Sequence, residues 1–224
     1  MKKTLLLLLF VPLFFFSACK DEEPIHGCLD SQAENYNPQA SLDNNSCEYL
    51  DIGATYKGGI VFYIDETGQH GLVAALEDIT EGSNMGGYGT AEGFEWGCYQ
   101  QIVNGADGKE IGRGYQNTLD IVAQNCQTEN GGITAAQATL NYTSEGFTDW
   151  YLPSFKELQE MYNTIGNGGS QGNIGDFETS DFPHYWSSSE SSLSNLAFYV
   201  EFNYGDDDSS GKSGSRRVRA VRAF

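Results

Sequence analysis

Two short apolar runs open the globular part of the chain. Residues 60–64 and 72–76 are apolar or aromatic throughout, whereas the seven residues between them, 65–71, are polar or glycine. Runs of this length bounded by turn residues are typical of buried β-strands. The pattern predicts a β-hairpin with a wide turn, covered on both faces. The next stretch, 80–114, is rich in glycine without periodicity and predicts long loops.

Two helices are predicted after these loops. The first, capped by Asn117, carries one apolar stripe that includes Cys126. The second begins at Thr134, which stands three residues before Gln137 in the spacing of a capping box. The stripe of the first helix consists of Tyr115, Leu119, Val122 and Cys126.

A third helix has the clearest boundaries in the sequence. It begins at Ser154, with Glu157 three residues later, and ends at Gly166. This spacing predicts a capping box at the start and a glycine C-cap at the end. Its apolar face consists of Phe155, Leu158, Tyr162 and Ile165.

The C-terminal third returns to a strand pattern. Residues 185–187, 197–202 and 217–221 are rich in β-formers and are separated by loops of Ser, Asn, Asp and Gly. In the last run Val221 breaks the alternation of the residues before it. The run is therefore predicted to contain a bulge or to be enclosed on both sides.

The N-terminus has the pattern of a signal peptide. A positive start and the apolar run 5–16, too short to span a bilayer, precede small residues and Cys19. The ending resembles the lipobox of bacterial lipoproteins, although Phe16 replaces the usual leucine. The resemblance implies removal of residues 1–18 and acylation of Cys19, and therefore attachment to the outer membrane by a lipid anchor.

The acidic segment after Cys19 bears on which way the protein faces. Residues 20–23 resemble the surface-export signal of Bacteroidetes-type lipoproteins, which implies display at the cell exterior. The alternative is an ordinary charged, solvated linker. The chain from Cys19 keeps ten of 12 Lys and Arg residues and all 31 Asp and Glu residues, a formal charge of about −21. Nucleic acid and anionic lipid surfaces are therefore poor partners.

Four cysteines remain once Cys19 is assigned to the lipid. In an oxidising compartment they predict two disulfides, and four cysteines allow three pairings. The local pairing, Cys28 with Cys47 and Cys98 with Cys126, is predicted because each pair lies inside one sequence module. No spacing of Cys and His is typical of zinc.

The cysteines also divide the chain. After the tether 19–26, residues 27–50 lack an apolar face and are predicted to be a stalk stapled by its disulfide, similar to Cys-bracketed motifs of bacterial surface proteins. Residues 51–224 form the main domain. The stalk's Asx residues are interpreted as turn formers, with calcium ligation as the alternative. They are Asp30, Asp43, Asn44 and Asn45.

Four motifs follow one another in the second half of the chain. They are Asp149-Trp150-Tyr151-Leu152-Pro153-Ser154, then Glu157-Leu158 with Met161-Tyr162, then Tyr185-Trp186-Ser187-Ser188-Ser189-Glu190 with Ala197, and finally Val218-Arg219-Ala220-Val221-Arg222-Ala223-Phe224. Together they resemble the Lcl C-terminal domain family over about residues 55–224. The resemblance implies an α+β, C-type-lectin-like fold, in which two to three helices flank a small twisted antiparallel sheet with long loops. The family is named for the C-terminal domain of a bacterial collagen-like adhesin, and the resemblance to that adhesin implies a sulfated polysaccharide as ligand.

Catalytic and metal motifs are weak in this chain. The string 168–172 matches GxSxG but follows a helix, which is the wrong context for a nucleophile elbow. His184, beside two aromatic residues, is interpreted as a packing residue. The acidic run Asp206, Asp207 and Asp208 is interpreted as a solvated hairpin tip, with metal binding as the alternative. No cofactor is predicted, although calcium stays an alternative.

Candidate ligand-binding residues are of two kinds. Aromatic residues in or beside the glycine-rich stretch can stack on sugars or anchor proteins, or can fix a long loop to the core. Arg216 and Arg217 can form a positive patch, or can pair with carboxylates and support the final strand. Trp150 and Trp186 are assigned to the core. The aromatic candidates are Tyr88, Trp96, Tyr99 and Tyr115.

These patterns lead to a functional hypothesis. The sequence favours a cell-surface lipoprotein with a non-catalytic lectin-like domain that binds a glycan or an extracellular protein in adhesion. The alternatives are a structural envelope or matrix protein and, with least support, an oxidase- or hydrolase-type enzyme.

Overall fold

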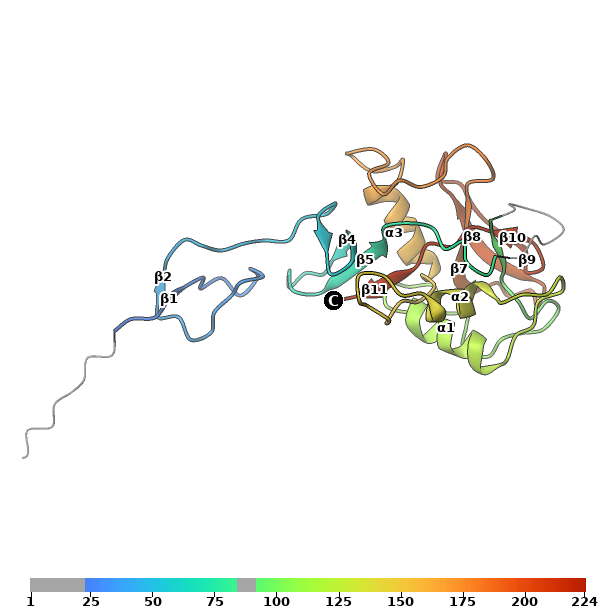
Figure 1. Cartoon of the computed structure of the whole chain (residues 1–224), viewed down its shortest axis with the longest axis horizontal. Helices are drawn as coiled ribbons and strands as arrows, with labels where there is room; N and C mark the ends of the chain where they lie inside the picture. Colours follow the sequence, from blue (N-terminus) through green and yellow to red (C-terminus); the bar gives the residue numbers. More distant parts are fainter. Residues whose placement is uncertain (1–22, 84–91) are drawn as a thin grey trace, which may run out of the picture.

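Two antiparallel sheets and three helices form the body in the computed structural model, which describes residues 23–83 and 92–224 (Figure 1). The first sheet has the strand order β11-β5-β4-β3 and the second β7-β8-β9. The fold is therefore α+β, with two main sheets where one was predicted. The strands are β3 (Thr55–Tyr56), β4 (Gly59–Ile64), β5 (Gly71–Ala75) and β11 (Val221–Ala223) in the first sheet, and β7 (His184–Glu190), β8 (Leu196–Glu201) and β9 (Asp207–Gly211) in the second.

The predicted hairpin is confirmed. β4 and β5 pair antiparallel, with a register shift between Val61 and Tyr63. Every residue of β5 is buried, because β11 pairs along its other edge and the core covers its faces. The continuous apolar pattern of these strands follows from this enclosure.

Helix α3 (Phe155–Ile165) joins the two sheets, and its predicted limits are confirmed. The Ser154 side chain accepts a hydrogen bond from the Glu157 N–H, and the Glu157 side chain accepts one from the Ser154 N–H. One face packs against β4 of the first sheet and against β7 and β8 of the second. Leu158 and Met161 are fully buried in that core.

The first predicted helix is present, but the residues predicted to form its buried face were wrong. In α1 (Gly114–Ala123) Asn117 is a buried interior residue, Tyr115 is half exposed, and Cys126 lies beyond the helix end. Asn117 donates to the Gly108 carbonyl and to the Ser188 hydroxyl, at 2.6 and 3.2 Å. The buried face therefore carries polar groups, which an apolar pattern does not reveal; the Asn117 amide nitrogen is bonded, whereas its oxygen has no partner in the described chain.

Helix α2 (Ala135–Asn141) begins where predicted. Thr134 accepts a hydrogen bond from the Gln137 N–H at 3.1 Å, but the Gln137 side chain donates to Asn141 and does not complete the capping box. One N–H of the first turn is thus satisfied by a side chain.

The predicted strand 217–221 was largely wrong, because only Val221 lies in a named strand and Arg217 forms an isolated bridge to Tyr185. β10 (Ser215–Arg216) pairs with β6 (Phe94–Glu95), and β11 pairs with β5. Residues 217–220, which connect β10 to β11, are all buried. Of the two explanations considered for the broken alternation, a bulge and enclosure on both sides, this burial agrees with enclosure. β9 was missed, because its acidic and serine-rich sequence has little β-propensity.

The N-terminal segment 23–50 has little regular structure. β1 (His26–Gly27) and β2 (Leu42–Asp43) form a two-residue parallel pair, and the predicted Cys28–Cys47 disulfide closes the segment. The carboxylate of Asp30 and the side-chain oxygens of Asp43 and Asn44 accept backbone N–H groups two residues onward. These are Asx turns, as interpreted from the sequence.

This segment lies at one end of the long axis of the molecule, and β9 and β10 lie at the other (Figure 1). It meets the body at the β4–β5 turn, where Gln69 donates to the Ser31 carbonyl at 2.6 Å and Gln32 donates to the Glu66 carbonyl at 3.2 Å. Among the described residues, no helix has the length and apolar character needed to cross a membrane. Cys19, the predicted lipidation site, lies outside the described residues.

Candidate functional site

The last strand region carries four arginines, and three of them are held inside the protein. Arg219 donates from Nε to Asp78 at 2.7 Å and from Nη1 to the Gly175 carbonyl at 2.8 Å, while its guanidinium lies 4.3 Å from the Phe177 ring centroid. Arg222 forms a two-pronged ion pair with Asp149 at 2.7 and 2.9 Å. Both arginines are buried and serve the core.

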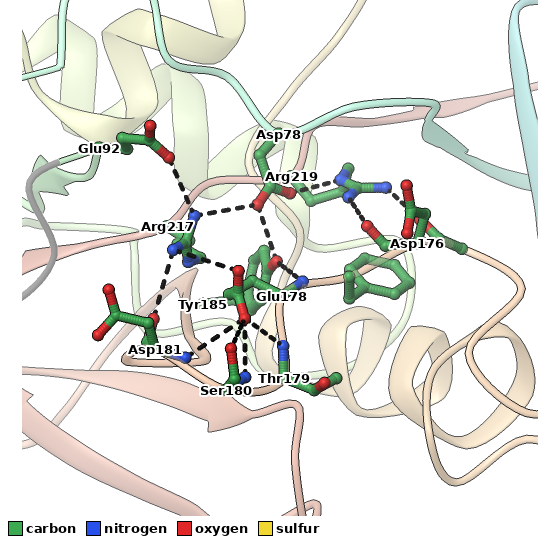
Figure 2. Close-up of polar contacts among 12 residues, drawn as sticks. Asp78, Glu92, Asp176, Glu178, Thr179, Ser180, Asp181, Tyr185, Arg217 and Arg219 are labelled. Atoms are coloured by element: carbon green, nitrogen blue, oxygen red, sulfur yellow. Dashed lines mark hydrogen bonds and ion pairs between the residues drawn. The ribbon is translucent and has the colours of Figure 1, made fainter.

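Arg217 is the third buried arginine. It lies among the carboxylates of Asp78, Glu92 and Glu178, at 3.8, 3.5 and 3.8 Å (Figure 2). It also donates to the Asp181 carbonyl. Of the two roles considered for Arg217, ligand contact and pairing with carboxylates, the structure shows the pairing, which surrounds its charge with three carboxylates.

A second set of hydrogen bonds links these carboxylates. The Tyr185 hydroxyl donates to Asp78 at 2.8 Å and accepts the Glu178 N–H at 2.9 Å (Figure 2). Burial, followed by the charge of Asp78, raises the pKa of Tyr185. Hydrogen bonds from Ser180 and Asp181, with the charge of Arg217, lower the pKa of Glu178 to about 2.

Arg216 has different surroundings. Its guanidinium carbon lies 4.5 Å from the Trp186 ring centroid and 4.7 Å from that of Tyr199, which are opposite one another on β7 and β8. Nη2 donates to the Ser210 hydroxyl at 2.5 Å, and Nε is buried without a partner. Within residues 23–83 and 92–224 no carboxylate forms an ion pair with it. Burial lowers the pKa of Arg216 to about 10.

A hollow of about 320 Å³ opens beside Arg216. Phe182 stands at its edge with 47% of its surface exposed and a φ of +48°, a left-handed conformation that is strained for a bulky residue. The His184 ring lies 4.9 Å from the Tyr199 ring and 6.1 Å from that of Phe182. The hollow is lined by Phe182, His184, Ser210, Gly211, Ser213, Gly214, Ser215 and Arg216.

A buried lysine fixes the rim of this hollow. Lys212, between two lining residues, is fully buried, forms a very short ion pair with Glu190 and donates to the Gln101 carbonyl at 2.7 Å. Its ammonium lies 4.6 Å from the Trp96 ring centroid and near the Cys98 carbonyl. The Cys98–Cys126 disulfide, formed as predicted, thus holds the loop to which the rim is bound.

The aromatic candidates do not gather at the hollow. Trp96 is completely buried and its indole N–H donates to a carbonyl of β7, so its assignment to the binding surface was wrong. Tyr99 is half-buried, and Tyr115 is 50% exposed with its ring edge-on to Tyr151. Tyr88 lies outside the described residues. Trp150 and Trp186 are core residues, as predicted.

The acidic run 206–208 is exposed, and two of its carboxylates accept hydrogen bonds, one from helix α3 and one from the adjacent backbone. Asp207 accepts a hydrogen bond from the Gln159 amide at 2.6 Å, and Asp208 accepts one from the next backbone N–H. In the described ranges no group of three or more His, Cys, Asp or Glu side chains is placed to hold a metal ion.

The GxSxG string has the structure predicted for it. Ser170 lies exposed in the turns that follow α3, where no strand enters and no helix leaves. His184 forms no hydrogen bond with a serine hydroxyl in the described chain. The hollow therefore combines one cation, one imidazole, one exposed phenyl ring and serine hydroxyls, a set of groups that can bind polar ligands.

Sequence analysis included Arg216 but missed Phe182 and His184. The signal was local: an aromatic residue and a histidine flank Pro183 just before a strand. Their pairing with residues 210–216 depends on the parallel bridge between Tyr185 and Arg217, a contact that sequence pattern does not show.

Comparison with known families gives one match. The family model of the Lcl C-terminal domain matches residues 92–222, more than half of the chain, and these residues include the whole hollow. The matched range excludes the β3–β4–β5 part of the first sheet. No curated protein matches the chain.

Proposed function

The chain belongs to the Lcl C-terminal domain family, and from this premise we propose that it is a cell-surface lipoprotein whose C-type-lectin-like body binds an anionic glycan. Binding, without catalysis, is its activity. The family membership gives no ligand, so the proposal depends on the site.

The unpaired charge of Arg216 carries the proposal. The Arg216 guanidinium is largely removed from water, and inside the protein it has one serine hydroxyl, two aromatic rings and no carboxylate, with Nε left unpartnered. The rings of Trp186 and Tyr199 hold it in one plane before any ligand arrives. An anionic group in the hollow supplies the missing partner, and a charged hydrogen bond of this kind contributes roughly 1.5–3 kcal/mol.

The rest of the hollow supports a sugar as the carrier of that anion. Phe182 offers an exposed ring for stacking against a pyranose face, and Ser210 and Ser213 add partly exposed hydroxyl-bearing side chains to the lining. A volume of about 320 Å³ is at the small end of known ligand sites. The site therefore suits one or two sugar units.

The charge of the whole protein limits how the ligand is recognised. The chain has a formal charge of −19, so its long-range field repels anions. Attraction is confined to the immediate surroundings of Arg216, within about one Debye length. We expect selectivity for the placement of a single anionic group, and little preference for total ligand charge.

The location of the protein is proposed from the N-terminal sequence. The basic start, the apolar run and Cys19 support lipid attachment, and the acidic residues after Cys19 support display at the cell exterior. Shaving intact cells with protease tests this. Protection of the protein, while a known surface protein is cleaved, would refute outward display.

A glycan array tests the function. The purified protein, its Arg216→Gln variant and its Arg113→Gln variant are compared on acidic and neutral glycans. Arg113 is an exposed arginine outside the hollow and serves as the matched control. We expect acidic glycans to bind the protein and the control, and Arg216→Gln to weaken binding at least about tenfold, since loss of a charged hydrogen bond has this magnitude.

Two results would contradict the proposal. Equal binding by Arg216→Gln would place recognition elsewhere on the surface. Absence of binding to any glycan or extracellular matrix protein would favour the structural envelope or matrix role.

A further inference from the structure

We infer that His184 is a second ligand-contact residue of the Arg216 hollow, and that it takes up a proton when an anionic group binds beside Arg216. This inference rests on the proposed function and adds a pH dependence to it. It concerns a residue that the sequence pattern assigned to packing.

The position of His184 is fixed by its neighbours. Its backbone carbonyl accepts the Arg217 N–H at 3.0 Å, and it is paired with Glu201 across β7 and β8. Its half-buried ring lies against Tyr199 on one side and Phe182 on the other, and lines the hollow together with Arg216. An anion held by Arg216 in this hollow is therefore next to the imidazole.

The charged groups around His184 come from four directions. Arg216 faces it from β10, and Glu201 is opposite it on β8. Beyond the Tyr199 ring are the acidic side chains of the β8–β9 hairpin, where Asp208 is paired with Tyr199. Arg217, which follows Arg216 in the sequence, has its guanidinium directed to the three carboxylates that surround it. Arg216 is thus the cation that lines the hollow with His184, and within the described chain it has no carboxylate partner.

Two effects act on His184 in the free protein. Burial, and then the positive charge of Arg216, lower the pKa of His184 below its ordinary value of 6.5. The ring is therefore neutral at neutral pH. An anion in the hollow offsets the field of Arg216 and accepts a hydrogen bond from the imidazolium, so the bound state favours the charged ring.

The sign of the pH dependence follows from this difference. The pKa of His184 is higher in the complex than in the free protein, so binding takes up protons between these two values. Affinity rises as the pH falls through the bound-state pKa and levels off below the free-state pKa. Each pKa unit by which the complex and the free protein differ gives about a tenfold change in affinity.

Nuclear magnetic resonance measures the coupling directly. His26 and His70, both exposed, are internal references for His184 in a single pH titration of the purified protein. We expect Arg216→Gln to raise the pKa of His184, because it removes the positive charge that lines the hollow with the imidazole. An unchanged His184 in this variant would overturn the inference without any ligand.

Ligand binding provides the second arm. The probe is a heparin oligosaccharide, whose sulfate groups keep their charge between pH 5.5 and 8. We expect affinity for the wild-type protein to rise about tenfold from pH 8 to pH 5.5, and to change less than about twofold in His184→Gln. Because the wild-type pKa of His184 with and without probe reports the same linkage, the test does not depend on that variant folding.

The outcomes separate the two proposals. Binding that is independent of pH, with an unmoved His184 pKa, overturns this inference and leaves the proposed function standing. Absence of heparin binding at both pH values, together with absence of any acidic glycan ligand on the array, overturns both.

Discussion

Arg216 and Arg217 are neighbours in the sequence and have opposite surroundings. Arg217 lies among three carboxylates, with a backbone carbonyl as a further acceptor. Arg216 lies on two aromatic rings, bonds one serine and has no carboxylate partner in the described chain. The comparison teaches that the presence of a counter-ion, more than burial, separates an arginine that maintains the fold from one that is available to a ligand.

The two environments also differ in the expected energy. Removing one partner of a buried ion pair costs about 3–5 kcal/mol, because the other charge is left unsatisfied. A guanidinium stacked on aromatic rings contributes about 0.5–2 kcal/mol. Substitutions in the carboxylate network should therefore lower stability, whereas substitutions in the hollow should mainly lower binding.

Replacing Arg219 should have the largest effect. Arg219→Met removes the ion pair to Asp78 and the donors to the Ala75 and Gly175 carbonyls. We expect the free energy of unfolding to fall by about 3–5 kcal/mol. Urea titration measures it, and Arg113→Met, at an exposed arginine, is the control that should change little. A loss as small as that of the control would show that the network does not support the fold.

Replacing Lys212, which holds the rim of the hollow, should have the second-largest effect on stability. Lys212→Met leaves Glu190 buried beside the Val103 N–H without its cation, and should cost about 3 kcal/mol. The double variant Lys212→Met with Glu190→Gln removes both charges and keeps an acceptor for that N–H. It should recover part of the lost stability, and a double variant no more stable than the single one would contradict the ion-pair explanation.

The neighbouring arginines give the sharpest comparison. Arg217→Gln should lower the free energy of unfolding by about 2 kcal/mol, and Arg216→Gln by about 1 kcal/mol or less. Glycan binding should show the reverse order, with the larger loss in Arg216→Gln. Equal losses of stability in the two variants, measured by urea titration, would show that Arg217 supports the fold no more than Arg216 does.

The smallest expected effect is the loss of stability at low pH when Glu178 becomes protonated. Hydrogen bonds from Ser180 and Asp181 hold the pKa of Glu178 at about 2, below its ordinary 4.5. The ionised carboxylate therefore stabilises the fold above pH 4.5, and this contribution is lost as the pH falls from 4.5 towards 2. Glu178→Gln should show a flatter loss of stability over that range, whereas Glu110→Gln, at an exposed glutamate, should follow the wild type. Thermal unfolding at several pH values measures both, and parallel curves for the two variants would contradict this role.

The sequence predicts those parts of the fold that local chemistry determines. Helix α3 has its capping box and its closing glycine within its own residues, so both ends were found. The β4–β5 hairpin is equally local. In α1 the buried residues include Asn117 and Thr118, whose partners lie far along the chain, and the apolar pattern therefore indicated the wrong face.

The candidate site was harder to predict for the same reason. Nothing in the sequence distinguishes Arg216 from Arg217, because the carboxylates that surround Arg217 come from distant segments. Trp96 was assigned to a loop surface, yet the Cys98 disulfide and the β6–β10 pairing hold it inside. The hollow itself forms from two segments more than twenty residues apart.

The stapled segment lies at one end of the long axis, and strands β9 and β10, which contribute lining residues of the hollow, lie at the other (Figure 1). In the lipid-anchored arrangement proposed above, the Arg216 side points away from the anchoring surface and is the side that contacts a ligand. The length of residues 23–50 then sets the height of that contact above the anchoring surface. Shortening this spacer would hide the hollow among surrounding molecules while leaving every group in it unchanged.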